Sequence, residues 1–179
     1  MFRRIAAMCS VVLAFFVFLP SPGLAQATET VAEVGMYLDC PNIDSWSVEG
    51  QSWAADNGYC QSADGFSPQD ERFGDCGSNS LYIYNEGGGE ALVELTAVSS
   101  LGPINAVSWR VDYFNYSTNT TPTANGGSDW VGGSTTWYRP VYKYTGAGFV
   151  VATLTQATVI LTSGGQCSTL WPSDSATIT

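Results

Sequence analysis

The sequence contains no histidine and only one lysine, Lys143, among its 179 residues. The absence of histidine excludes Ser-His-Asp and Cys-His catalysis, histidine metal sites and the usual general base near neutral pH. A Ser–Lys dyad needs a buried, neutral lysine, whereas Lys143 stands between Tyr142 and Tyr144 in a strand-like segment and is expected to be solvated. We therefore predict no catalytic residue and no cofactor. A carboxylate-pair hydrolase stays open, because sixteen acids are present.

Basic residues are scarce in general. Six Lys and Arg residues face sixteen Asp and Glu residues, which gives a formal net charge of −10. Nucleic acids and anionic membranes require a positive protein surface, so the sequence excludes both as partners. An acidic surface of this kind is expected to keep the protein soluble and monomeric.

The amino terminus has the three parts of a secretory signal peptide. Arg3 and Arg4 form a basic region, the apolar run Ile5–Leu19 follows, and the small residues Ala25 and Ala27 mark the cleavage site. The apolar run is shorter than the ~20 residues of a transmembrane helix. We predict that residues 1–27 are a cleaved signal peptide, with cleavage after Ala25 as an alternative, and that the product is secreted or held at the cell surface without a membrane anchor.

Cleavage would leave four basic residues against sixteen acids, a charge of −12, and an even number of cysteines. These are Cys40, Cys60, Cys76 and Cys167. In an exported domain of this size they predict two disulfides, and we expect the pairs Cys40–Cys60 and Cys76–Cys167. A zinc site is disfavoured because the sequence has neither a CxxC pair nor a histidine.

The remaining chain, 28–179, is predicted to be one β-domain. Turn-forming residues dominate 28–79, and the main strands lie in 80–179, where Asn105–Tyr116 alternates apolar and polar residues. Strands are predicted at Val31–Leu38, Ser45–Trp53, Leu81–Asn85, Ala91–Ser99, Asn105–Tyr116, Thr135–Tyr144, Phe149–Thr162 and Ala176–Thr179. Ser117–Ser134 is predicted to be a polar loop, and no helix is predicted. The fold class is all-β, an antiparallel β-sandwich of immunoglobulin-like or jelly-roll-like type, with a small β-barrel as the alternative.

Four aromatic residues are candidate binding residues. Trp130 lies in the polar loop, and Tyr138, Tyr142 and Tyr144 fall on one face of the strand Thr135–Tyr144. Exposed aromatic side chains of this kind stack on sugar rings or anchor a protein partner. For the three tyrosines the sequence nevertheless favours another interpretation, in which they form a core face with their hydroxyls reaching outward.

A structural calcium site is a further hypothesis. Exported domains bind Ca²⁺ through carboxylates in turns, and Asp56, Asp64, Asp70 and Asp75 crowd into twenty residues. Their spacing does not match an EF-hand loop, and the same residues are ordinary turn formers.

These observations favour a secreted, non-catalytic β-sandwich that binds a glycan or a protein partner outside the cell. The first alternative is a structural or surface-assembly subunit that pairs through an exposed edge strand, such as Ala176–Thr179 or Val31–Leu38. The second alternative is a small carboxylate-dependent polysaccharide hydrolase.

Overall fold

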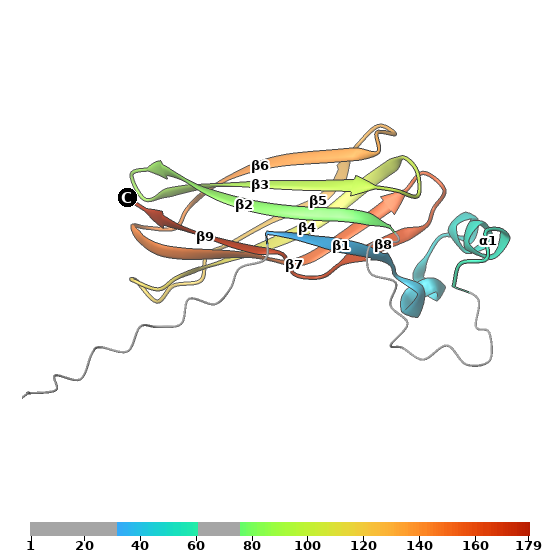
Figure 1. The fold of residues 1–179 in the computed structure, drawn as a ribbon, viewed down its shortest axis with the longest axis horizontal. Coiled ribbons are helices and arrows are strands. Elements are labelled where there is room, and N and C mark those ends of the chain that lie inside the picture. Colours follow the sequence, from blue (N-terminus) through green and yellow to red (C-terminus); the bar gives the residue numbers. More distant parts are fainter. Residues whose placement is uncertain (1–31, 61–75) are drawn as a thin grey trace, which may run out of the picture.

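The computed structural model of the chain describes residues 32–60 and 76–179. Nine strands form one antiparallel sheet in the order β5-β4-β7-β8-β1-β2-β3-β6, and β9 pairs with β7 (Figure 1). The strands are β1 (Glu33–Leu38), β2 (Gly77–Gly87), β3 (Glu90–Ser99), β4 (Ile104–Asn115), β5 (Thr123–Trp130), β6 (Thr136–Tyr144), β7 (Gly148–Leu161), β8 (Gln166–Thr169) and β9 (Ser173–Ile178). The all-β antiparallel prediction is confirmed.

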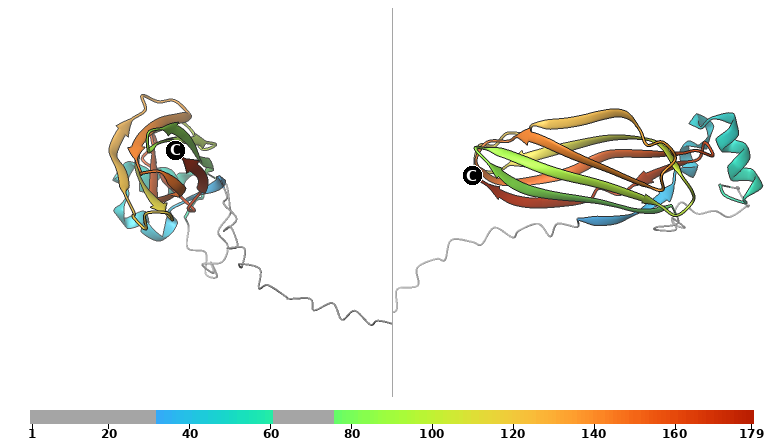
Figure 2. Two further views of the ribbon diagram at one scale, coloured as in Figure 1. Left: turned by 90° about the vertical axis from the view of Figure 1, so that its left-hand side faces the viewer. Right: turned by 90° about the horizontal axis from the view of Figure 1, so that it is seen from above.

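The sheet curls until it is nearly closed into a barrel, which corresponds to the alternative architecture. Figure 2 shows the strands encircling a common interior when the molecule is viewed along its length. The first half of β7 pairs with β9, and its second half pairs with β8, so the gap between β7 and β2 is filled by different strands at the two ends. The barrel stays open between β5 and β6, because no ladder joins these two strands.

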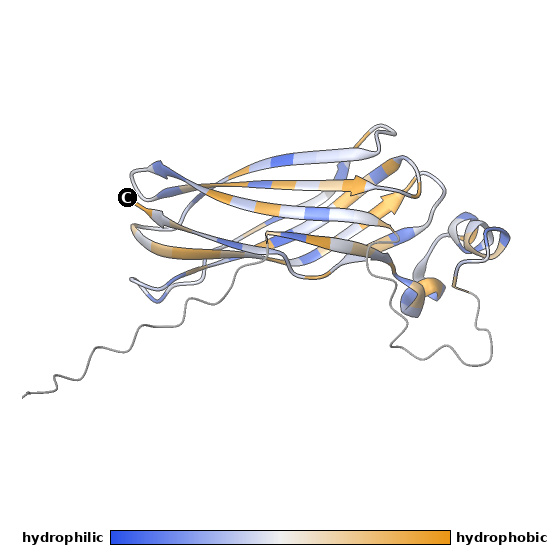
Figure 3. Cartoon of the chain, in the orientation of Figure 1, coloured by the Kyte–Doolittle hydropathy of each residue, from blue (hydrophilic) through white to orange (hydrophobic). Residues whose placement is uncertain are grey.

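Alternating residues of the long strands fill the interior. On β3, Ala91, Val93, Leu95 and Ala97 are fully buried while the intervening residues are more exposed. The alternation of apolar and polar bands is visible along the strands in Figure 3. The described part of the chain has a single buried hydrophobic cluster, to which the helical segment and every strand except β5 contribute, and the partly buried Ala124 of β5 packs against it.

The strand predicted at Ser45–Trp53 is wrong. The stretch instead contains the end of the 3₁₀-helix η1 (Cys40–Ser45) and most of the α-helix α1 (Val48–Asp56). The two helices lie at one end of the barrel (Figure 1). The Ser47 hydroxyl caps α1 by accepting a hydrogen bond from the Gly50 N–H at 3.1 Å. Gly50 is required there because a Cβ atom would lie 2.2 Å from the carbonyl oxygen of Gly164 in the β7–β8 turn.

The polar loop predicted at Ser117–Ser134 contains β5, which the sequence did not indicate. Every side chain of β5 that the structure describes is half-buried or exposed, so no apolar alternation marks the strand. Its position is set by pairing with β4 and by Gly126, where a Cβ atom would meet the Trp109 indole at 2.3 Å. The strand is specified by its pairing with the preceding strand and not by an apolar pattern of its own.

The two segments predicted as exposed edges are not free edges. β1, within Val31–Leu38, pairs with β2 on one side and with β8 on the other. β9, which contains most of Ala176–Thr179, pairs with β7, and its other side lies against β2, where the Asp174 carboxylate accepts from the Ile83 N–H at 3.1 Å. The path of paired strands ends at β5 and β6, and the side of β9 that faces β2 is covered by that strand without a ladder.

Both predicted disulfides are confirmed. Cys40–Cys60 brackets the helical segment, with 5.1 Å between its Cα atoms. Cys76–Cys167 links the residue before β2 to β8 across 91 positions of sequence, with 6.2 Å between its Cα atoms. Cys76 and Cys167 are both fully buried in the barrel core, so the second bridge ties the beginning of the main sheet to its end.

Candidate functional site

A tyrosine-rich surface covers the outer side of the three neighbouring strands β2, β3 and β6. On β6, Trp137 and Val141 turn into the core, so Tyr138, Tyr142 and Tyr144 point outward and are 53%, 59% and 70% exposed. The interpretation that the sequence favours, that these tyrosines form a core face, is therefore wrong. Two further exposed tyrosines join them from β2. We call the set the tyrosine face: Tyr82, Tyr84, Tyr138, Tyr142 and Tyr144.

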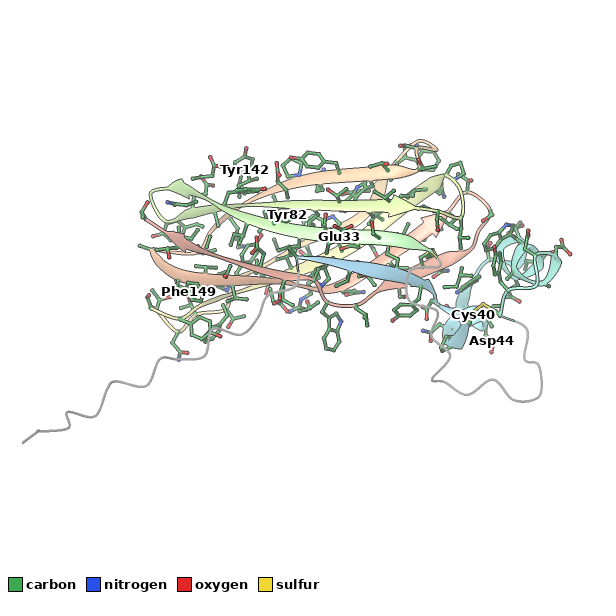
Figure 4. The ribbon with its side chains drawn as sticks, in the orientation of Figure 1. Glu33, Cys40, Asp44, Tyr82, Tyr142 and Phe149 are labelled. Carbon is green, nitrogen blue, oxygen red and sulfur yellow. A yellow bond between two sulfur atoms is a disulfide. The ribbon has the colours of Figure 1, made fainter. Side chains whose placement is uncertain are left out.

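The register of the sheet brings the two groups of tyrosines together. Tyr84 and Tyr142 lie on either side of Leu92 of β3, and Tyr82 lies directly opposite Glu94. Figure 4 labels Tyr82 on β2 and Tyr142 on β6. Neither β2 tyrosine was singled out from the sequence, although the alternation of Leu81 and Ile83 with Tyr82 and Tyr84 was a usable signal.

Glu94 is the carboxylate at the centre of the tyrosine face. The Tyr138 hydroxyl donates a hydrogen bond of 2.5 Å to its Oε1 atom. This bond raises the pKa of Tyr138, because the carboxylate stabilises the protonated phenol. Burial raises the pKa of Tyr84, and the negative charge of Glu94 raises it further. Both phenols are therefore kept as hydrogen-bond donors beside a carboxylate.

A cleft of about 460 Å³ adjoins the tyrosine face at the open seam of the barrel. It lies between β5 and β6 and is lined by Asp129, Trp130, Val131, Thr136, Trp137, Tyr138 and Arg139. Trp130 is 76% exposed beside it. Because Tyr138 belongs to both the cleft and the tyrosine face, the structure brings Trp130 and Tyr138, two of the predicted binding residues, to one surface, while Tyr142 and Tyr144 continue along β6.

The Asp129 carboxylate connects the strands that line this cleft. Its Oδ2 atom accepts a hydrogen bond from the Trp109 Nε1–H at 3.1 Å and lies 3.7 Å from Nε of Arg139 on the opposite strand. The carboxylate therefore joins β5 both to the core of β4 and to β6. This arrangement holds Trp130, the next residue, at the mouth of the cleft.

The free edges on both sides of the seam carry features that resist the addition of another strand. In the β3–β6 ladder Ser99 N–H bonds Thr135 O and Thr145 N–H bonds Gly89 O, so antiparallel alternation turns the Pro140 nitrogen away from β3. Proline there removes a donor from the free edge. On β5, the ladder register shifts between Val107 and Trp109, and such bulges twist an edge away from pairing.

The two acids at outward positions of β3 do not form a hydrolytic pair with each other. Glu90 and Glu94 face the same way on β3 but are four residues apart, about 13 Å along a strand. Glycosidase carboxyl pairs are about 5–9.5 Å apart. Asp112 is engaged instead by Arg110 Nε at 3.0 Å and by two threonine hydroxyls.

The predicted calcium residues fall mostly outside the structure's described part. Asp64, Asp70 and Asp75 lie in 61–75, and Asp56 is the last residue of α1. Within 32–60 and 76–179 no group of three or more Asp, Glu, Cys or His residues is placed to hold a metal ion. The predicted signal peptide, 1–27, also lies outside the described residues, and no helix in the described ranges is long and apolar enough to cross a membrane.

Comparisons with known proteins leave the site to be interpreted from its own chemistry. No protein-family model matches the chain, and no significant match is found among curated proteins or among solved structures.

Proposed function

We propose that this protein is an exported, non-catalytic domain that binds a glycan through the tyrosine face and the adjoining cleft beside Trp130. The observation that carries the proposal is the concentration of five exposed tyrosines on one face of a sheet. Large exposed aromatic surface is uncommon on monomeric proteins and marks binding sites. The signal-like amino terminus and two disulfides in a chain of this size support export.

The shape of the surface suits an extended sugar chain. Tyr138, Tyr142 and Tyr144 span about 20 Å of strand, which is longer than one sugar ring. Aromatic rings offer a flat apolar surface to the C–H faces of sugars, while the phenolic hydroxyls bind sugar hydroxyls. We therefore propose an oligosaccharide or polysaccharide as the ligand rather than a monosaccharide.

The assembly alternative has less support. It needs an unprotected edge strand, whereas β1 is paired on both sides and the β6 edge carries Pro140. The hydrolase alternative needs a carboxyl pair at the right separation, and Glu90 and Glu94 are too far apart along β3 to supply one.

The test is retention on a panel of insoluble polysaccharides, followed by calorimetry with soluble oligomers of the best ligand. Replacing one stacking tyrosine, as in Tyr142→Ala, should weaken binding by about 0.5–1.5 kcal/mol, a few-fold to about tenfold. Tyr116→Ala is the matched control, because Tyr116 is 57% exposed but packs against Phe149 away from the tyrosine face.

Trp130→Ala tests the cleft in the same way, with Trp171→Ala as its control, because Trp171 is 72% exposed in the β8–β9 connection. Retention that survives the combined replacement of Tyr138, Tyr142 and Tyr144 by alanine would show that the tyrosine face is not the binding surface.

A further inference from the structure

The tyrosine face has a one-sided charge. Outward-facing positions of β2, β3 and β6 alternate with buried ones, and the charged side chains at the outward positions of β3 are Glu90 and Glu94. The two basic residues of β6, Arg139 and Lys143, occupy the alternate positions of the strand. Arg139 is half exposed at the seam, where its Nε atom lies 3.7 Å from the Asp129 carboxylate, and Lys143 is half-buried. The face therefore presents carboxylates and aromatic rings without a basic side chain of its own.

Glu94 lacks a cationic partner within the described residues. The ion pairs found there are Arg110–Asp112 and Arg139–Asp129. Oε1 of Glu94 receives the Tyr138 hydroxyl, and the side chain is half-buried between Tyr82 on one strand and Pro140 on the other. An ammonium group at such a position is attracted by two features: the charge of the carboxylate and the negative faces of the neighbouring aromatic rings.

We infer that the glycan bound by the tyrosine face carries protonated amino groups, and that Glu94 binds one of them while the tyrosines stack on the sugar rings. The inference rests on the proposed function and names its substrate class: a polysaccharide of amino sugars with free amines. The chain's net charge of −10 favours the approach of such a cationic polymer.

A glycan fits the surface better than a basic protein segment does. The face is a sheet surface with aromatic side chains spread over three strands, a platform on which successive rings can stack. Protein hot spots instead occupy well-packed, fully desolvated pockets, and the cleft that adjoins the face lies at the seam, beyond Tyr138.

The test compares two glucosamine oligomers of equal length, one fully N-acetylated and one fully deacetylated, at a pH where the free amine is protonated. Calorimetry on the wild-type protein should give about tenfold tighter binding of the deacetylated oligomer, since a cation held by a carboxylate and aromatic rings contributes that much. The preference should shrink as salt is added, because the surface is largely exposed.

Glu94→Gln is the diagnostic variant. It keeps an acceptor for the Tyr138 hydroxyl and removes the charge, so most of the preference for the deacetylated oligomer should be lost, while the neutral oligomer should bind as it does to the wild type. Glu49→Gln removes the same charge from the exposed start of α1, away from the tyrosine face, and should preserve the preference. Equal thermal midpoints of the three proteins show that folding is unchanged.

The outcomes separate the inference from the proposed function. Binding of the acetylated oligomer without a preference for the amine, or a preference that Glu94→Gln does not reduce, overturns the inference and leaves glycan binding standing. Glu94-dependent binding of a lysine-rich peptide without binding of either oligomer overturns it in favour of a basic protein partner. If neither the oligomers nor any polysaccharide of the panel binds, the proposed function itself is wrong.

Discussion

The two disulfides should make very different contributions to stability, although both cross-link the same chain. Cys76–Cys167 closes a loop of 91 positions and lies in the barrel core. Cys40–Cys60 closes only 20 positions and encloses the helical segment at the end of the barrel. The perturbation is the replacement of each pair by two alanines, so that the two effects can be compared in the same background.

The chain-entropy relation gives about 4.6 kcal/mol for the longer loop and about 3.3 kcal/mol for the shorter one. The first value should appear in full, because strands β1 to β8 all lie between or beside the joined residues and must unfold together. Removing two buried sulfur atoms adds a cavity cost. The second value should appear only in part, about 1 kcal/mol or less, because η1 and α1 can open without unfolding the barrel.

Guanidinium chloride unfolding at neutral pH measures both effects through tryptophan fluorescence. We expect the barrel midpoint to fall strongly in Cys76→Ala/Cys167→Ala and only slightly in Cys40→Ala/Cys60→Ala. Limited proteolysis of the second variant should cut within or next to α1 under conditions where the barrel stays intact. If removal of Cys40–Cys60 lowers the barrel's stability as much as removal of Cys76–Cys167, the helical segment is part of one cooperative unit, and this reasoning is wrong.

Three further substitutions test separate features of the fold. Burial raises the pKa of Asp112, but hydrogen bonds from two threonines and an arginine outweigh it, so the net pKa is lowered from 3.8. The resulting stability is present above that value and is lost as the pH falls through the folded-state pKa. Asp112→Asn should therefore flatten the decline of the thermal midpoint at acidic pH. Pro140→Val restores a free-edge donor, so we expect concentration-dependent association by light scattering, and a strictly monomeric variant would contradict the edge argument. Gly126→Ala places a methyl group against the Trp109 indole and should lower the thermal midpoint and shift tryptophan fluorescence, whereas an unchanged spectrum would contradict the contact.

The parts of the fold that could be predicted are those in which one face of a strand is buried. On β4, Val107, Trp109, Val111 and Tyr113 alternate with more exposed residues and are all buried. Burial on one side of a strand imposes a period of two on the sequence, and that period is visible without a structure. The pairing of the four cysteines could also be predicted from the sequence. The strand pattern shows where the main sheet begins and ends, and Cys76 and Cys167 lie at these two places.

The helix and β5 could not be predicted from periodicity, for different physical reasons. α1 has only nine residues, its most apolar side chain, Val48, is 78% exposed, and it buries a glycine and an alanine instead. The local signals that could have identified it are the Ser47 cap and Glu49 in the first turn. β5 offers no such signal, because its structure depends on pairing with β4. The paired residues lie far apart in the sequence at the end of the ladder, where Trp130 is opposite Ala106.

The candidate site shows where sequence reasoning stops. Alternation placed Tyr138, Tyr142 and Tyr144 on one face, but it did not indicate which face of β6 is buried. The decision depends on Trp137 and Val141 filling the interior. The inclusion of the β2 tyrosines depends on register across β3, which is a property of the assembled sheet.

The turns at the barrel end opposite α1 depend on Asn115, a fully buried amide at the end of β4. Its Nδ2 group donates to the carbonyl oxygens of residues 145–147 at 2.9, 3.1 and 3.2 Å, and its Oδ1 atom accepts from the N–H groups of Ser117 and Thr118. One side chain therefore satisfies backbone groups of two loops. Asn115→Ala should destabilise the protein by about 2–3 kcal/mol, because several of these groups would be buried without a partner.

Asn115→Asp separates the donor role of this amide from its acceptor role. A carboxylate keeps the bonds to Ser117 and Thr118 but turns a negative oxygen toward the three carbonyl oxygens of residues 145–147, so the fold raises the pKa of the new carboxyl. A raised carboxyl pKa means that the stability of the variant is highest below the unfolded-state value and falls as the pH rises through the folded-state value. We expect a lower thermal midpoint at pH ~7 than at pH ~4 for this variant, relative to the wild type. Asn119→Asp makes the same chemical change at an exposed turn position with φ +53° and should show no such trend. Parallel pH profiles for the two variants would mean that the amide donor of Asn115 does not hold the loops together.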